Sequence, residues 1–127
     1  MVENISKEFW EIIMNTLPFE LTFIDKDERI VYFNREGRRI FSRSQAIIGR
    51  KVQQCHPHKT LHLVNQVIND LRSGRRDHAS FWIDVHRRKL YIRYFAIRDE
   101  ENNYLGCMEL TQDITEIQQI DGERRLL

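Results

Sequence analysis

The second half of the chain constrains the fold most, because it places one amphipathic helix directly before three strand-like segments. Residues 57–72 carry apolar side chains at helical spacing, and Gly74 follows them as a stop signal. Residues 78–86, 89–98 and 104–115 alternate apolar and polar side chains, as half-buried strands do. Short polar turns separate these segments, so we expect consecutive antiparallel hairpins. The sequence therefore predicts an antiparallel sheet against which the preceding helix packs.

The first half supplies two further strands and several short helices. Residues 20–25 and 29–34 are rich in β-forming side chains around a polar turn, which predicts another hairpin. Asn34 can cap a short helix over residues 35–41, and residues 42–50 form a further helical turn. Five strands with helices inserted after the second predict an α+β fold, a five-stranded antiparallel sheet with helices covering one face. The space between sheet and helices is the natural site for a small molecule.

The two ends of the chain are expected to lie outside this sheet domain. Residues 1–17 have apolar side chains at helical spacing, Ser6 is a candidate N-cap, and Pro18 ends the pattern. This N-terminal amphipathic helix has a broad apolar side, so we expect it to contact a second copy or to cap the domain. Residues 18–118 form the domain itself, and residues 119–127 form a C-terminal tail or signalling helix.

Length and charge narrow the classes of protein to consider. A chain of 127 residues fits one domain, and its net charge of +1 argues against a dedicated nucleic-acid binder, which needs a basic surplus. No apolar run is long enough for a membrane span, so we expect no membrane partner. Two cysteines are too few for a disulfide scaffold and fit free thiols in the cytoplasm. Residues 35–51 are basic and residues 99–116 acidic, which is typical of solvated faces or of complementary docking patches.

Three motifs resemble those of PAS domains. Residues 21–34 resemble the opening PAS hairpin that ends in a helix-capping Asn, here Asn34. Residues 48–50, Ile-Gly-Arg, resemble the Gly-Arg pair before the long helix, and residues 113–116 resemble the exit from the last strand into a signalling helix. The resemblance covers roughly residues 17–118. It implies a sensory and relay domain that binds a ligand or cofactor between sheet and helices.

A narrower resemblance points to one subgroup of these domains. Residues 49–57, 81–83, 98–100 and 122–127 resemble a PAS module found at the C-terminus of some bacterial hemerythrin-like proteins. This likeness implies that the chain is one end of a longer bacterial protein. An effector or a hemerythrin-like region is then the expected partner within that protein.

Several polar or soft side chains are candidates for lining the ligand site. The predicted set is Asn34, Cys55, His56, Thr60, Val64, Tyr94 and Cys107. Cys55 and His56 come just before Pro57, where the helix dipole can lower a thiol pKa and make the cysteine redox-active or a haem ligand. A buried apolar cysteine and a capping histidine are the structural alternative. Each of the other candidates can equally be satisfied by structural contacts.

Metal, haem and flavin remain weak alternatives, so no cofactor is assigned. Cys55, His58 and His62 have short, ligand-like spacings that make them weak candidates for a metal. His62 lies opposite the apolar stripe of its helix, which argues against an inward haem ligand. The position that follows Gly-Arg-Lys is Val52, where light-sensing members have a reactive cysteine, so a flavin adduct is not expected. Plain flavin binding remains open.

The sequence shows no signature of catalysis. It has neither a glycine-rich phosphate loop nor a nucleophilic serine elbow, and no carboxylate lies on an evident apolar face. We therefore expect a non-enzymatic sensor and protein-interaction module, a homodimer through the N-terminal helix or the sheet face. Two alternatives are a redox, metal or haem sensor centred on Cys55 and His56, and a ligand-free dimerisation module.

Overall fold

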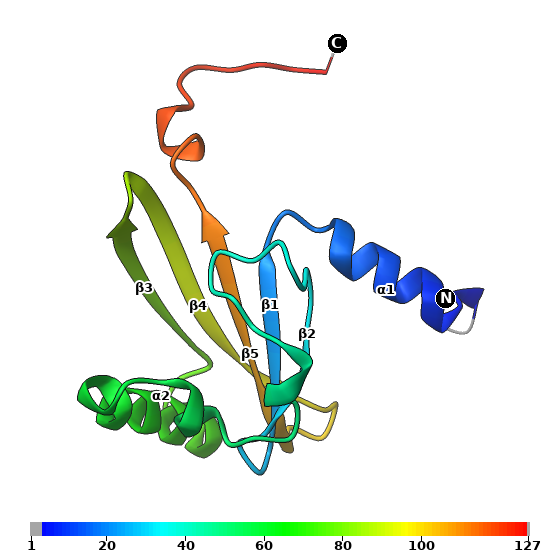
Figure 1. Ribbon diagram of the computed structural model, residues 1–127, viewed down its shortest axis with the longest axis vertical. Coiled ribbons are helices and arrows are strands. Elements are labelled where there is room, and N and C mark those ends of the chain that lie inside the picture. The colour runs from blue at the N-terminus through cyan, green and yellow to red at the C-terminus, as the bar shows by residue number, and fades with distance from the viewer. Residues whose placement is uncertain (1–3, 127) are drawn as a thin grey trace.

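Five segments with alternating side chains form one sheet in a computed structural model that describes residues 4–126 (Figure 1). The strands are β1 (Glu20–Asp25), β2 (Ile30–Phe33), β3 (His78–Val85), β4 (Arg88–Arg98) and β5 (Tyr104–Asp113). Their spatial order is β2-β1-β5-β4-β3, and every neighbouring pair is antiparallel. The predicted α+β fold is confirmed. The first and last strands of the sequence lie side by side at the centre of the sheet.

Two α-helices accompany the sheet, and their termini follow the sequence signals. They are α1 (Lys7–Thr16) and α2 (Leu61–Ser73). The Ser6 side chain caps α1 by accepting the backbone N–H three positions later at 3.1 Å, and Gly74 ends α2 in the left-handed region with φ 80°. The helix predicted from residue 57 begins later. Pro57 has extended geometry and precedes a single 3₁₀ turn, so the α-helix starts at Leu61.

The helix predicted over residues 35–41 is wrong. Arg35 and Gly37 adopt positive φ values of 59° and 79°, which no right-handed helix accommodates. Asn34 does not cap a helix but is buried, and its side chain accepts the Leu21 N–H at 2.7 Å and donates to Met14 O at 2.7 Å. Residues 35–44 therefore cross the sheet as an irregular segment. The turn expected within residues 42–50 is present as a 3₁₀ helix, Gln45–Ile47.

Of the two alternatives for the C-terminal segment, the described residues form a tail and not a signalling helix. Only Ile117–Gln119 forms a 3₁₀ turn, and residues 120–126 have no regular structure. Gly122 has a positive φ of 65°, and the Asp121 side chain accepts its N–H at 2.8 Å, a local arrangement that competes with helix. The ends of the predicted terminal segments, residues 1–3 and 127, lie outside the described part.

The core lies between one face of the sheet and α2. Buried residues of the core include Ile24, Ile30, Val52, Val67, Ile68, Leu71, Ala79 and Cys107. Figure 1 shows α2 across one end of the sheet and α1 projecting beyond the β2 edge. We call the face toward α2 the inner face. It is the face on which the PAS-like site was expected.

A candidate ligand site on the inner face of the sheet

The strand register brings polar side chains together on the inner face. One row across the sheet contains Thr22, Glu109 and Tyr94, and the adjacent row contains Thr111, Ile92 and Phe81. Alternate residues of a strand share a face, so Glu109 and Thr111 point to the same side as the core residue Cys107. Glu109 and Thr111 are only 5 % and 1 % exposed. A polar cluster is thus buried beside the apolar core.

Arg39 ties the irregular segment to the edge of this cluster. Its side chain is 1 % exposed, lies 3.6 Å from the Glu20 carboxylate and donates to the backbone oxygens of Leu21, Asn34 and Phe41. Glu20 in turn accepts the backbone N–H groups of Ile40 and Phe41. Burial lowers the pKa of Arg39, and the charge of Glu20 opposes that change. These bonds hold the segment against β1 without any helix.

Arg43 reaches the second buried carboxylate, that of Glu109. Its Nη2 lies 3.6 Å from Glu109 Oε1, and its side chain is 10 % exposed. On the other side, Tyr94 donates its hydroxyl proton to Glu109 Oε2 at 2.7 Å. Burial and then the charge of Glu109 raise the pKa of Tyr94 well above its ordinary value. The phenol therefore stays neutral and acts as a hydrogen-bond donor.

Two polar atoms of this cluster have no hydrogen-bond partner among residues 4–126. They are Arg43 Nε and Thr111 Oγ1, both buried from solvent. Native proteins pair nearly all buried polar atoms, and an unpaired one costs about 1–3 kcal/mol. The cluster is therefore incomplete as the chain alone forms it.

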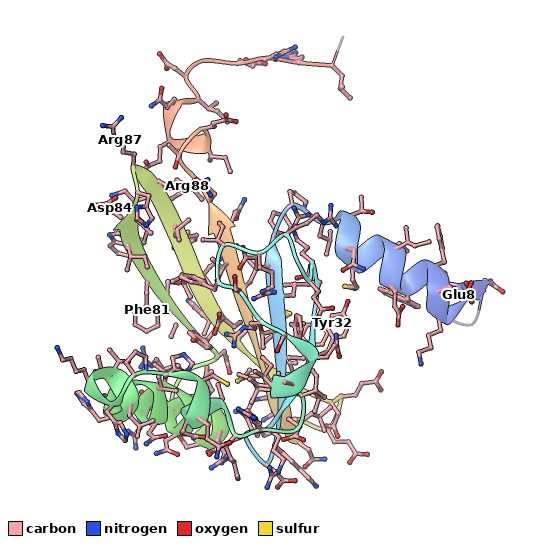
Figure 2. The ribbon with its side chains drawn as sticks, viewed as in Figure 1. Glu8, Tyr32, Phe81, Asp84, Arg87 and Arg88 are labelled. Atoms are coloured by element: carbon pink, nitrogen blue, oxygen red, sulfur yellow. The ribbon has the colours of Figure 1, made fainter. Side chains whose placement is uncertain are left out.

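Exposed apolar side chains lie on the same face of the sheet, on β3. Phe81 and Ile83 are 41 % and 40 % exposed on β3. The Phe81 ring meets the Tyr94 ring edge to face, with centroids 6.2 Å apart. Figure 2 shows Phe81 projecting from β3 above α2 in this view. The inner face therefore combines a buried polar cluster with an exposed apolar margin.

Four of the predicted site residues belong to the core or to structural contacts. Asn34 connects α1 to β1, as described above. Cys107 is fully buried, and its burial raises the thiol pKa to about 11, so the thiol stays protonated. Cys55 and Val64 are partly buried and pack against the core cluster. These two side chains form part of the apolar packing on the α2 side of the core.

The predicted residues at the start of α2 do not converge on one centre. His56 Nδ1 lies 3.0 Å from Val52 O, and Thr60 is exposed with its hydroxyl bonded to Pro57 O at 3.3 Å. His62 is exposed, as its helical phase predicted, and His58 is exposed too. Within the described residues, no group of three or more His, Cys, Asp or Glu side chains could hold a metal ion. Cys55, His58 and His62 are therefore not assembled as a metal site.

Sequence reasoning missed the most polar part of the site. The expectation that no carboxylate lies on an apolar face is wrong. Glu20 and Glu109 are buried on the same face of their strands as the core residues Ile24 and Cys107. Arg39 and Arg43 of the basic run also turn inward instead of forming a solvated or docking face. Glu109 lies two positions from Cys107 in a predicted strand, and this spacing could have revealed that its carboxylate faces the core. Nothing in the sequence could show that the segment carrying Arg43 lies across β5.

A separate hollow lies between α1 and the outer face of the sheet. It measures about 480 Å³ and is lined by Lys7, Trp10, Glu11, Met14, Phe23 and Tyr32. Phe9 and Ile12 on α1 are 52 % and 59 % exposed. The helix thus leaves much of its apolar surface unburied. Within the described residues, no helix is both long and apolar enough to span a membrane.

Comparisons with known proteins agree with this architecture. A family model described as a PAS domain matches residues 10–115. Searching the curated proteins gave no match. The crystal structure of a C-terminal domain from Streptococcus mutans is 35 % identical, with a TM-score of 0.85, over 92 % of this chain and 91 % of that one. The narrower resemblance to a module of hemerythrin-like proteins gains no support from these comparisons.

More distant matches share the fold. The PAS domain of Bordetella pertussis BvgS is 18 % identical with a TM-score of 0.65, over 88 % of each chain. A sensory box sensor histidine kinase from Vibrio cholerae is 17 % identical with a TM-score of 0.60, over 86 % of this chain and 91 % of that one. This chain therefore belongs to the PAS domain family, and it shares its fold with domains of sensor histidine kinases.

Proposed function

We propose that this PAS domain is a sensory and signal-relay module that binds a small molecule on its inner face. The observation that carries the proposal is that the inner face holds two buried atoms without partners, Arg43 Nε and Thr111 Oγ1, and an exposed Phe81 in the same sheet row as Thr111. A ligand that supplies the missing hydrogen bonds removes the cost of leaving them unpaired. It also covers apolar surface that the chain leaves exposed.

The path of the signal follows from where the cluster is attached. Glu109 and Thr111 lie on β5, which pairs with both β1 and β4 and ends shortly before the Ile117–Gln119 turn. Arg43 belongs to the irregular segment that covers β1. A ligand held by both elements favours the arrangement in which segment and sheet are together, and it shifts the population by its difference in affinity. The C-terminal end of β5 is the output in this proposal.

The first experiment asks whether a small molecule accompanies the purified protein. An absorption spectrum and mass spectrometry of the supernatant after denaturation would reveal a cofactor or a released ligand. Hydrogen exchange should then show that the amides of residues 35–44 and 104–119 are less protected after the ligand is removed than before. A protein that releases nothing, and whose melting temperature no compound of a metabolite library raises, would refute small-molecule sensing.

Self-association through α1 is the second proposed function, supported by the exposed Phe9 and Ile12 and by the hollow beside the helix. Phe9 and Ile12 lie on the side of α1 turned away from Lys7 and Glu11, which line that hollow. A second copy of the helix can bury this uncovered apolar side, so the partner proposed is a second copy of this chain.

A further inference from the structure

A polar hollow lies where the C-terminal end of α1 meets the irregular segment. It measures about 280 Å³, and its lining includes charged side chains of both signs, namely Glu11, Arg35, Glu36 and Arg38. It shares no lining residue with the polar cluster of the inner face. Sites for drug-sized molecules usually measure about 300–1,000 Å³, so this hollow has room for the polar end of a small metabolite.

Both arginines of the hollow are held in place by backbone oxygens at the end of α1. Arg35 Nη1 donates to Leu17 O at 2.8 Å and to Asn15 O at 3.3 Å. Arg38 Nη2 donates to the same Asn15 oxygen at 2.8 Å. Two guanidinium groups that share one acceptor lie close together, and each has five N–H donors, more than these bonds use. Fixed neighbouring guanidinium groups of this kind favour a carboxylate between them.

The two carboxylates of the hollow are not neutralised by these arginines. Within residues 4–126, neither Glu11 nor Glu36 forms an ion pair, and neither does Arg35 or Arg38. The Glu11 charge is felt by the Tyr32 phenol, because burial and then this carboxylate raise the pKa of Tyr32. Unlike charges thus line one hollow without meeting. A molecule that carries both an ammonium group and a carboxylate is complementary to the two sets.

The polar hollow adjoins the larger hollow between α1 and the outer face of the sheet. Glu11 and Tyr32 line both of them. The larger hollow measures about 480 Å³ and is also lined by Trp10, Met14 and Phe23. The rings of Phe23 and Tyr32 lie 5.2 Å apart between centroids, and Figure 2 shows Tyr32 on the side of the sheet from which α1 projects. An apolar group attached to the polar end of a ligand would be covered by these side chains.

We propose that the two hollows together bind a free amino acid with a large apolar side chain. Its carboxylate accepts hydrogen bonds from Arg35 and Arg38, and its ammonium group lies near Glu11 and Glu36. Its side chain packs in the larger hollow against Tyr32. This site is additional to the one proposed on the inner face, and the bound amino acid connects α1 with the irregular segment.

Four probe compounds test this class of ligand by titration calorimetry. They are L-phenylalanine, glycine, N-acetyl-L-phenylalanine, which has no ammonium group, and L-phenylalaninamide, which has no carboxylate. Phenylalanine should bind, glycine should bind more weakly because it has no apolar side chain, and the two blocked compounds should lose at least about tenfold in affinity because each lacks one charged contact. A blocked compound that binds as tightly as phenylalanine would overturn the proposed class, and so would glycine.

Charge-neutralising variants with matched controls test the place of binding. Glu36→Gln and Arg38→Gln should each weaken phenylalanine about tenfold or more, since each removes a charged partner. Glu100→Gln and Arg50→Gln change exposed side chains that do not line the hollow, so they should leave affinity unchanged. Thr111→Val on the inner face should leave it unchanged too.

Thermal denaturation without ligand checks that each variant is folded. Glu36 forms no ion pair within the described residues, so its variant should melt as the wild-type protein does. Wild-type affinity in both Glu36→Gln and Arg38→Gln would exclude this hollow as the site. Failure of phenylalanine to bind the wild-type protein would overturn the inference and leave the inner-face proposal standing.

Discussion

At the scale of single residues, the stability of the inner face depends on how its buried polar atoms are paired. The Tyr94 hydroxyl is a donor that holds the Glu109 carboxylate at 2.7 Å. Its raised pKa keeps the proton on the phenol, so the bond persists through the neutral pH range. The buried surroundings of Glu109 have a low dielectric constant. Loss of the Tyr94 hydroxyl is therefore costly, because the carboxylate cannot turn to water instead.

Tyr94→Phe should lower the free energy of unfolding by about 1–3 kcal/mol, because it leaves a buried carboxylate oxygen without its donor. Urea denaturation followed by circular dichroism measures the change. Tyr91→Phe is the matched control, since Tyr91 lies on the outer face of the same strand and is half-buried. Equal losses for the two variants would mean that the bond to Glu109 adds nothing specific.

The two cysteines should differ sharply in thiol reactivity. Cys107 is fully buried with a thiol pKa of about 11, while Cys55 is only partly buried. A disulfide reagent acts on the thiolate and needs access, so at pH 8 the folded protein should expose one fast thiol and one that reacts only on unfolding. Cys55→Ser should abolish the fast phase. Rapid labelling of Cys107 in that variant would contradict the burial described for β5.

At the scale of elements, the pairing of β1 with β5 depends on a glycine. Gly106 has φ 145° and lies opposite Asp25 in the sheet. A Cβ atom there would collide with the backbone oxygen of Ile24 and crowd the backbone of Asp25. The two central strands can approach each other only because this side chain is missing.

Gly106→Ala should destabilise the domain by at least about 2 kcal/mol, through backbone strain and collision with a strand that cannot move away. Gly49→Ala is the control, because Gly49 also has a positive φ, 87°, but a Cβ there meets no atom within 4 Å. That variant should lose only about 1 kcal/mol. Thermal or urea unfolding distinguishes the two, and a Gly106 variant as stable as the Gly49 variant would show that β1 shifts to accommodate the methyl group.

At the scale of the whole molecule, the exposed face of α1 determines whether two copies associate. The double variant Phe9→Glu with Ile12→Glu should convert a dimer to a monomer in sedimentation equilibrium, because it places four carboxylates in the proposed helix pair. Lys7→Glu changes a charge on the opposite side of the helix and should leave association unchanged. A monomeric wild-type protein at tens of micromolar would refute the pairing.

The sequence by itself determined the strands, α1, α2 and the antiparallel hairpins, because each depends on side-chain periodicity and on local stop signals such as Gly74. It also placed His62 outward by helical phase alone. The path of residues 35–44 was decided only by tertiary contacts, since Arg39 and Asn34 find their partners on strand β1 and at the end of α1. The polar cluster depends on the same contacts. Glu109 and Arg43 are far apart in the chain, and their meeting depends on strand register and segment path, which no local pattern encodes.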